Sequence, residues 1–221
     1  MTNIKKALSI PRFEGYRRTP TEPDIECMKR YVWNVALSEA LYPTIQFLEI
    51  ALRNSIHDAA TSAFNNDFWF DNPKVISNPK TLRIISGAKG ALAKAHKPIE
   101  SGRVVAELDF GFWRALFYNE YERKLWRQII GDVFPNAPRR QRQRRLISPR
   151  VEKVRDLRNR ISHHEPIWHW SDLENRHQEM LETIEWINTP LRELVEICDR
   201  FDEVYSMDVQ GLEPQLKKLN V

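Results

Sequence analysis

Apolar residues recur at three- and four-residue steps along most of the chain, a period that predicts helices. The longest such pattern covers residues 21–64. Beyond residue 43 its apolar face consists of Ile45, Leu48, Leu52, Ile56 and Ala59. Pro43 lies inside this pattern, and proline lacks the amide hydrogen that an inner helical turn uses. We therefore expect this helix to kink or split near residues 41–42.

Further stretches of the same period predict helices over most of the remaining chain. They are residues 81–96, residues 104–134 with an interruption near Gly111, a segment that ends before Pro166, and residues 171–205 with a kink near Asn188. No stretch shows the alternation of a strand with hairpin turns, and no Gly- or Ser-rich linker divides the chain. We predict an all-α protein with one helical domain at residues 21–205, an N-terminal arm at residues 1–20 and a polar C-terminal tail at residues 206–221.

Composition adds few constraints. Of the 221 residues, 42% are hydrophobic and 29% are charged, which is ordinary for a globular protein. The net charge of +4 leans towards an anionic partner. Cys27 and Cys198 are too few for a disulfide framework, and the N-terminus has no signal-peptide pattern. No apolar run approaches the roughly 20 residues of a membrane span. We expect a cytoplasmic protein that does not enter a membrane.

One short stretch concentrates the residues that can carry chemistry. "LRNRISHHEPIW", residues 157–168, holds two arginines, an asparagine and two adjacent histidines before a proline. On a helix, Asn159 and His163 share a face, whereas Arg158 lies about 140° from His163. The residue before a proline avoids the helical region, so the helix should end near His164.

This combination suits the cleavage of RNA through its 2′-hydroxyl group. The reaction needs a group that takes or gives a proton near neutral pH, which histidine does. It also needs a lasting positive charge opposite the phosphate, and a guanidinium binds phosphate oxygens in a fork. A polar side chain beside the histidine can orient its ring. None of these roles requires a metal or another cofactor.

The same stretch resembles the R-x4-6-H signature of HEPN domains, with Arg158, four intervening residues and His163, and with the polar Asn159 after the arginine. Two upstream blocks, "YVWNVALSEALYPTIQFLEIALRNSIHDAA" and "FGFWRALF", are similar to the Abi-like (abortive infection) branch of these proteins and stand in the expected order. Together the three stretches span about residues 31–168.

The resemblance implies an all-α helical bundle of HEPN type with additional helices and, in active members, a metal-independent endoribonuclease. It also implies a homodimer in which the motifs of two protomers meet in a composite active site. Such a protein acts in phage defence or as a toxin, where a protein or RNA antitoxin is a further partner. In this chain Arg158 would stabilise charge on the phosphorane, His163 would act as general acid or base, and Asn159 would orient His163 or the phosphate.

Glu49, Arg53 and Asn54 on the long N-terminal helix could support this site. Glu49, Arg53 and His57 follow one another at four-residue steps on one helical face. One interpretation is a surface ion pair that contributes little stability. The other follows from the "ALRN" block, which is similar in the family, and is that Arg53 and Asn54 support the cleft or contact RNA.

A basic strip precedes the motif helix. It consists of Arg139, Arg140, Arg142, Arg144 and Arg145. The strip is either a solvated loop or a surface that binds the RNA backbone, because arginines gain affinity by releasing counterions from phosphates.

Other features near the motif leave alternatives open. His164, which would share a helical face with Arg160, is a second catalytic group, a phosphate contact or a packing residue. Trp168 and Trp170 either stack on a base or anchor the loop after the motif. The histidines around the motif match no compact zinc-ligand spacing, so we expect no metal site.

Two other classes of protein compete with the nuclease. One is a non-catalytic RNA-binding subunit with the same basic surface, and the other is a purely structural interaction protein. The combination of arginine, asparagine and histidine favours catalysis, because binding alone does not need an imidazole at that spacing.

Overall fold

The computed structural model describes residues 2–212 and residue 216, so residues 213–215 and 217–221 of the predicted tail lie outside the described residues. The described part of the chain is helical and contains no strand, which confirms the all-α prediction. The α-helices are α1 (Thr2–Leu8), α2 (Ile10–Glu14), α3 (Asp24–Phe64), α4 (Pro79–Lys94), α5 (Ser101–Glu107), α6 (Phe110–Ala115), α7 (Arg127–Val133), α8 (Arg144–Ser162), α9 (Leu173–Ile187), α10 (Thr189–Glu196) and α11 (Phe201–Met207). Short helices of other types lie at Trp69–Asp71, Asn119–Tyr121, Glu122–Trp126 and Val209–Leu212.

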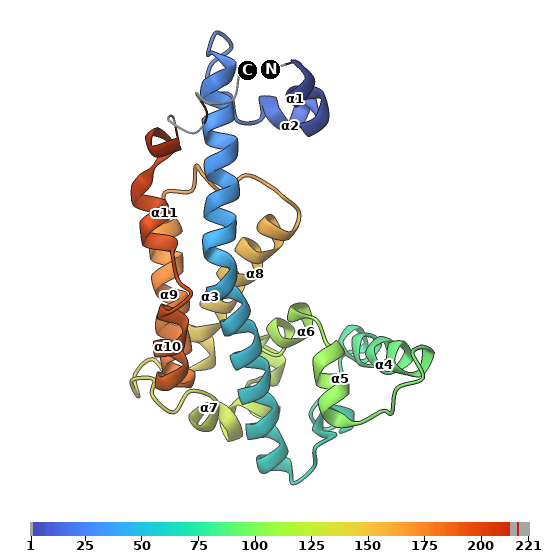
Figure 1. The fold of residues 1–221 in the computed structure, drawn as a ribbon. Helices are drawn as coiled ribbons and strands as arrows, with labels where there is room; N and C mark the ends of the chain where they lie inside the picture. Colours follow the sequence, from blue (N-terminus) through green and yellow to red (C-terminus); the bar gives the residue numbers. More distant parts are fainter. Residues whose placement is uncertain (1, 213–215, 217–221) are drawn as a thin grey trace.

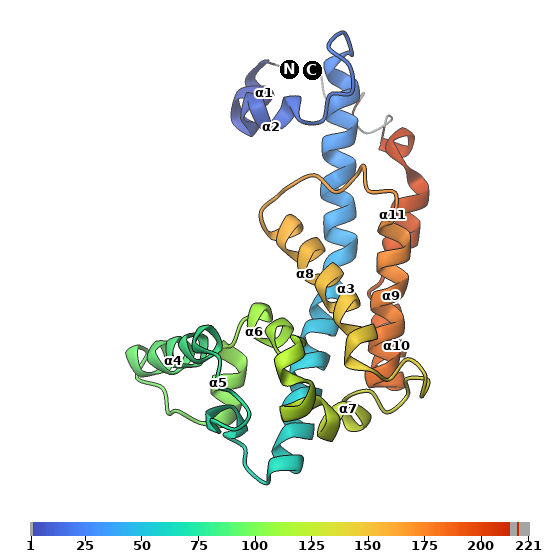
Figure 2. The same cartoon turned by 180° about the vertical axis from the view of Figure 1, so that it is seen from behind.

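The long helix α3 runs through the centre of the molecule, and the other helices pack along it (Figure 1). α9, α10 and α11 lie along one flank, and α4, α5 and α6 form a lobe beside its C-terminal half (Figure 1). α8 lies against α3 on the face that Figure 2 turns to the viewer. One apolar core joins these elements, and Trp69, Trp113 and Trp126 are among its largest fully buried side chains.

α3 continues unbroken through Pro43, so the predicted split near residues 41–42 is wrong. A proline inside a helix removes one backbone hydrogen bond, but the turns on both sides of this one are tied into the core. Leu41, Thr44 and Ile45 are buried around it. Tertiary packing supplies most of the stability of a helix in a protein, and it offsets the local cost of the proline here.

By length and composition, α3 is the one helix among the described residues that could cross a membrane. Judged by composition, α3 is apolar enough to span a membrane, so the expectation that no segment is apolar enough to do so is not met. The core helix of a globular protein passes the same test. The leucines of α3 that are buried in the protein core are Leu37, Leu41, Leu48 and Leu52.

The first residues of the chain form two short helices that pack on the N-terminal end of α3. A second, smaller apolar cluster there consists of Phe13, Tyr16, Cys27, Met28 and Leu216. Asp24, in the first turn of α3, pairs with Lys5 at 2.6 Å and with Arg17 at 2.7 Å. An acidic residue in the first turn also complements the helix dipole, so Asp24 ties both preceding segments to α3.

The region from residue 104 to residue 134 is more divided than the single predicted interruption near Gly111. α6 begins after Asp109, whose side chain accepts a hydrogen bond of 2.9 Å from the Phe112 amide. A helix is stabilised when its first free amides are capped in this way. A second division follows over residues 116–126, which include a 3-10 turn and a π-helical turn before α7.

The helix predicted over residues 171–205 is divided into α9, α10 and α11, so it is broken rather than kinked. Asn188 has extended backbone angles, and its side chain accepts a hydrogen bond of 2.8 Å from the Leu191 amide at the start of α10. Nε2 of the buried His177 of α9 lies 2.8 Å from Oδ2 of Asp199, which precedes α11. These polar contacts fix the turns between the three helices.

Candidate functional site

The motif helix α8 packs one face on the core and leaves the motif residues on its other faces. Its buried side chains are Ile147, Val151, Val154 and Leu157. The helix ends at Ser162, two residues before the predicted end at His164, and His163 is its C-terminal cap residue. His164 has a left-handed φ of 56°, a conformation that histidine adopts more readily than most residues. The Glu165 amide donates a 2.8 Å hydrogen bond to the Arg160 carbonyl and closes the helix.

The loop after the motif is tied to α3. The Asn34 side-chain oxygen accepts hydrogen bonds from the amides of Ile167 at 2.7 Å and Trp168 at 3.1 Å. The Trp168 ring stacks on Tyr16 at 6.4 Å between ring centres, and the Arg30 guanidinium lies 5.4 Å from the Trp168 ring. Of the two alternatives for Trp168, the structure therefore favours the one in which it anchors this loop.

Asn159 and His163 face the same cavity, as their four-residue spacing predicts. This motif cavity has a volume of about 370 Å³ and is lined by Asp156, Asn159, Arg160, His163, Glu165, Trp170 and Arg176. The His163 side chain is exposed and has no hydrogen-bond partner among the described residues. Its ring is therefore free to contact a bound molecule.

Arg158 lines a second cavity, of about 330 Å³, between α8 and α3. Its Nε lies 3.8 Å from Oε2 of Glu49, and Arg53 lines the same space. We call this space the Glu49 cavity. Burial raises the pKa of Glu49, and the positive charges of Arg158 and Arg53 act in the opposite direction. Glu49 and Arg53, two of the three predicted supporting residues on α3, therefore line the same cavity as Arg158.

The motif arginine and the motif histidine thus face different cavities. Their five-residue separation corresponds to about 140° on a regular helix, and α8 stays helical up to Ser162. Ser162, which is four residues from Arg158 and shares its face, also lines the Glu49 cavity. One protomer therefore does not bring Arg158 and His163 to a single cavity.

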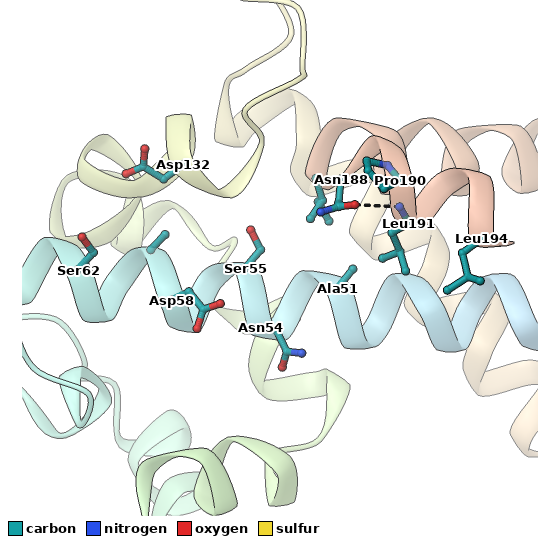
Figure 3. Close-up of a pocket in the computed structure, with 12 residues that line it drawn as sticks. Ala51, Asn54, Ser55, Asp58, Ser62, Asp132, Asn188, Pro190, Leu191 and Leu194 are labelled. Atoms are coloured by element: carbon teal, nitrogen blue, oxygen red, sulfur yellow. Dashed lines mark hydrogen bonds between the residues drawn. The ribbon is translucent and has the colours of Figure 1, made fainter.

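Asn54, the third predicted supporting residue, lines neither of these cavities. It faces a larger one of about 700 Å³, formed by residues of α3, α7 and α10 (Figure 3). In this cavity the Ser55 hydroxyl already donates a 3.0 Å hydrogen bond to the Val133 carbonyl. The carboxylates of Asp58 and Asp132 point away from one another in Figure 3. The larger cavity does not bring together a set of reactive groups.

His164 and His57, two other histidines singled out in the sequence, line neither the motif cavity nor the Glu49 cavity. His164 lies beyond the end of α8, and its carbonyl accepts a 3.0 Å hydrogen bond from Arg12 of α2. His57 does not continue the row of charged side chains on α3, because its Nδ1 accepts a 3.1 Å hydrogen bond from the Trp69 indole. Burial lowers the pKa of His57. It is therefore a neutral packing residue at neutral pH.

The five arginines of the basic strip do not form one solvated row. Arg142 donates to the carbonyls of Pro135 at 2.6 Å and Ala137 at 2.8 Å. Arg144 pairs with Glu122 at 2.6 Å. The exposed members of the strip are Arg139, Arg140 and Arg145.

The strip also lies far from the motif. It ends where α8 begins, whereas the motif is at the other end of this helix (Figure 2). α8 has 19 residues, which correspond to about 27 Å along its axis. A nucleic acid that contacts both places must follow the length of α8.

If the exposed part of the strip binds the RNA backbone, replacement of Arg139, Arg140 and Arg145 with glutamine should weaken RNA binding. The slope of log affinity against log salt should flatten by about 1 for each lost phosphate contact. Affinity measured at several salt concentrations tests this, and an unchanged slope would mean that the strip is only a solvated loop. The same change at Arg142 and Arg144 should lower the melting temperature, because it removes their contacts with the folded chain.

Three residues of the motif cavity, Asp156, Glu165 and Arg176, are not among the candidates that the sequence supplied. Asp156 stands three residues before Asn159 and seven before His163, so the helical period could have identified it. Arg176 comes from α9, and no local pattern connects it with the motif.

No protein-family model, no curated protein and no solved structure matches this chain. The resemblance of residues 31–168 to Abi-like HEPN proteins is therefore carried by the motif and its two upstream blocks alone. The fold and the site define an all-α protein with an Arg/Asn/His motif at the end of a core helix, between two open cavities.

Proposed function

We propose that the chain is an endoribonuclease of HEPN type that cleaves RNA without a metal ion. The observation that carries the proposal is the end of α8. Asn159 and His163 face the open motif cavity there, and Arg158 lies at the neighbouring Glu49 cavity. An exposed imidazole in a cavity that also contains guanidinium groups supports phosphoryl transfer from a 2′-hydroxyl group.

In the proposed reaction the 2′-oxygen forms a bond to phosphorus, and the bond from phosphorus to the 5′-oxygen breaks. His163 takes the proton of the 2′-hydroxyl group as general base, or gives a proton to the 5′-oxygen as general acid. Arg158 stabilises the charge that builds on the phosphorane oxygens, and Asn159 orients His163 or the phosphate. The products carry a 2′,3′-cyclic phosphate and a 5′-hydroxyl group.

The active form in this proposal is a homodimer with composite sites. Arg158 and His163 line different cavities of one chain, so a two-fold axis beside the helix ends would supply both groups to one phosphate. Large apolar side chains at the Glu49 cavity support such an interface: Tyr42 is 58% exposed and Ile50 is 37% exposed. Exposed apolar surface at a site is typical of a place where proteins meet.

The resemblance suggests a cytoplasmic protein of a phage-defence or toxin–antitoxin system. RNA would be the substrate, and a protein or RNA antitoxin would be a further partner. The exposed arginines of the basic strip support an RNA partner, because they gain affinity from displaced counterions.

Incubation of the protein with total RNA in EDTA, followed by mapping of the fragment ends, tests the proposal. We expect cleavage to persist and to leave 2′,3′-cyclic phosphate and 5′-hydroxyl ends, because arginine supplies the positive charge. Activity that disappears in EDTA and returns with Mg²⁺ or Zn²⁺, or products with 5′-phosphate ends, would contradict it. RNA that is bound and never cut would favour a non-catalytic RNA-binding subunit.

A further inference from the structure

The motif cavity holds more polar and aromatic groups than the proposed reaction uses. Beside the proposed catalytic residues, its walls contain two guanidinium groups, an indole ring and two carboxylates that the reaction does not require. The carboxylate of Asp156 already pairs with Arg155 at 2.7 Å. The other four groups belong to Arg160, Arg176, Trp170 and Glu165. This set of groups is suited to the recognition of a planar, polar ligand.

The Arg176 guanidinium stacks over the Trp170 ring, and this stacked pair forms a wall of the cavity that is ordered by its surroundings. The guanidinium carbon of Arg176 lies 4.5 Å from the centre of the Trp170 ring. Asp172 lies 2.8 Å from Nε of Arg176, and the Lys153 carbonyl accepts a 3.3 Å hydrogen bond from Nη1. The Trp170 ring itself packs against the apolar core. Nucleobases stack on guanidinium planes as well as on aromatic rings, so the outer face of the Arg176 guanidinium, on the side away from Trp170, is suited to a base.

Arg160 and Glu165 provide hydrogen-bonding groups next to this wall. Nη1 of Arg160 lies 3.4 Å from Oε2 of Glu165, and the two side chains are 42% and 50% exposed. The Arg160 guanidinium carbon is 5.5 Å from the centre of the Trp170 ring. Both side chains can therefore turn towards a base on the wall without breaking a buried contact.

The donors and acceptors of this pair match guanine. Guanine presents its O6 acceptor beside two donor groups, N1–H and the N2 amine. A guanidinium donates to guanine O6 and N7, and a carboxylate accepts from amino groups of bases. Adenine, cytosine and uracil lack two adjacent donors, so each of them would leave part of the carboxylate without a partner.

We infer that the motif cavity is a guanine-binding subsite. The base stacks on the outer face of Arg176, Glu165 accepts hydrogen bonds from its N1 and N2 groups, and Arg160 donates to its O6. His163 lines the same cavity, so the guanosine would adjoin the phosphodiester bond that is cut. The identity of the ligand as a guanosine of RNA rests on the proposed function.

Binding of 3′-GMP, 3′-AMP, 3′-CMP and 3′-UMP to the full chain, measured by calorimetry, tests the inference. We expect GMP to bind about 5- to 150-fold more tightly than the other three, which is the discrimination of one good bidentate contact to a base. Glu165→Gln should remove most of this preference, because the glutamine amide group would meet the donors of guanine. Arg160→Gln should reduce it as well. Glu193→Gln is the matched control, because Glu193 is exposed on α10 and outside the cavity.

Equal affinities for the four nucleotides would overturn the inference, as would a GMP preference that survives in Glu165→Gln. Binding of a mononucleotide does not require cleavage, so the result can be separated from the proposed function. A chain that cuts RNA at all four bases and shows no GMP preference keeps the nuclease and loses the subsite. A chain that prefers GMP and never cuts RNA keeps the subsite and loses the nuclease.

Discussion

Alanine in place of His163 is expected to lower the rate of RNA cleavage by about 10²- to 10⁴-fold, the usual contribution of a general acid or base. The imidazole is exposed and has no hydrogen-bond partner among the described residues, so its removal should leave the packing of α8 intact. The melting temperature should therefore stay the same. Single-turnover cleavage of a labelled RNA, measured together with a thermal unfolding curve, separates the two effects.

The matched control for this variant is His169→Ala. His169 is also an exposed histidine in the same part of the chain, and it lines neither the motif cavity nor the Glu49 cavity. The control should cleave RNA at the rate of the parent protein. Undiminished activity of His163→Ala, or equal losses in both histidine variants, would contradict the role of His163 in proton transfer.

A mixture of the Arg158→Ala and His163→Ala proteins is expected to regain the cleavage that neither variant shows alone. Arg158 and His163 face different cavities of one chain, so each proposed site takes its arginine from one protomer and its histidine from the other. With free exchange of chains, about half of the dimers contain one chain of each variant. Each of these mixed dimers has one complete site out of two. Activity should therefore reach about a quarter of the parent value. The measurement is cleavage by an equimolar mixture after exchange.

A chain that carries both substitutions provides the control for the mixture. Mixed with either single variant, it cannot complete a site and should restore nothing. Differently tagged chains show whether exchange has taken place. If exchange occurs and the two single variants still restore no activity, then either Arg158 and His163 act from the same protomer or one site needs all four groups of the dimer. A protein that cleaves RNA while light scattering finds only monomers would rule out the composite site.

The helical period predicted the elements whose buried faces are regular. α4, at Pro79–Lys94, lies within two residues of the helix predicted over residues 81–96. The helical period could not predict that α3 stays helical through Pro43, because its continuity depends on packing against other helices on both sides of the proline. The sequence indicated a kink near Asn188, but not the complete break there, where Asn188 leaves the helical conformation and caps α10.

Spacing within α8 was enough to predict that Asn159 and His163 share a face, because a helix converts sequence separation into angle. The tertiary neighbours of the motif were not accessible in this way, since Arg176 reaches the motif cavity from α9. For Arg142 and Arg144, the sequence pattern suggested a role that the fold does not give them. They stand in a run of arginines that suggests solvation or RNA binding, and the fold uses both of them to hold its own chain.

Because α3 is continuous, insertions and deletions between its residues Asn34 and Glu49 should be poorly tolerated. Its Asn34 holds the amides of Ile167 and Trp168 beyond the motif, and its Glu49 faces Arg158 at the start of the motif. Both attachments belong to one unbroken helix. A deletion or insertion of one residue between Asn34 and Glu49 would rotate one attachment by about 100° relative to the other. This part of the chain can therefore accept substitutions far more readily than a change in the number of its residues.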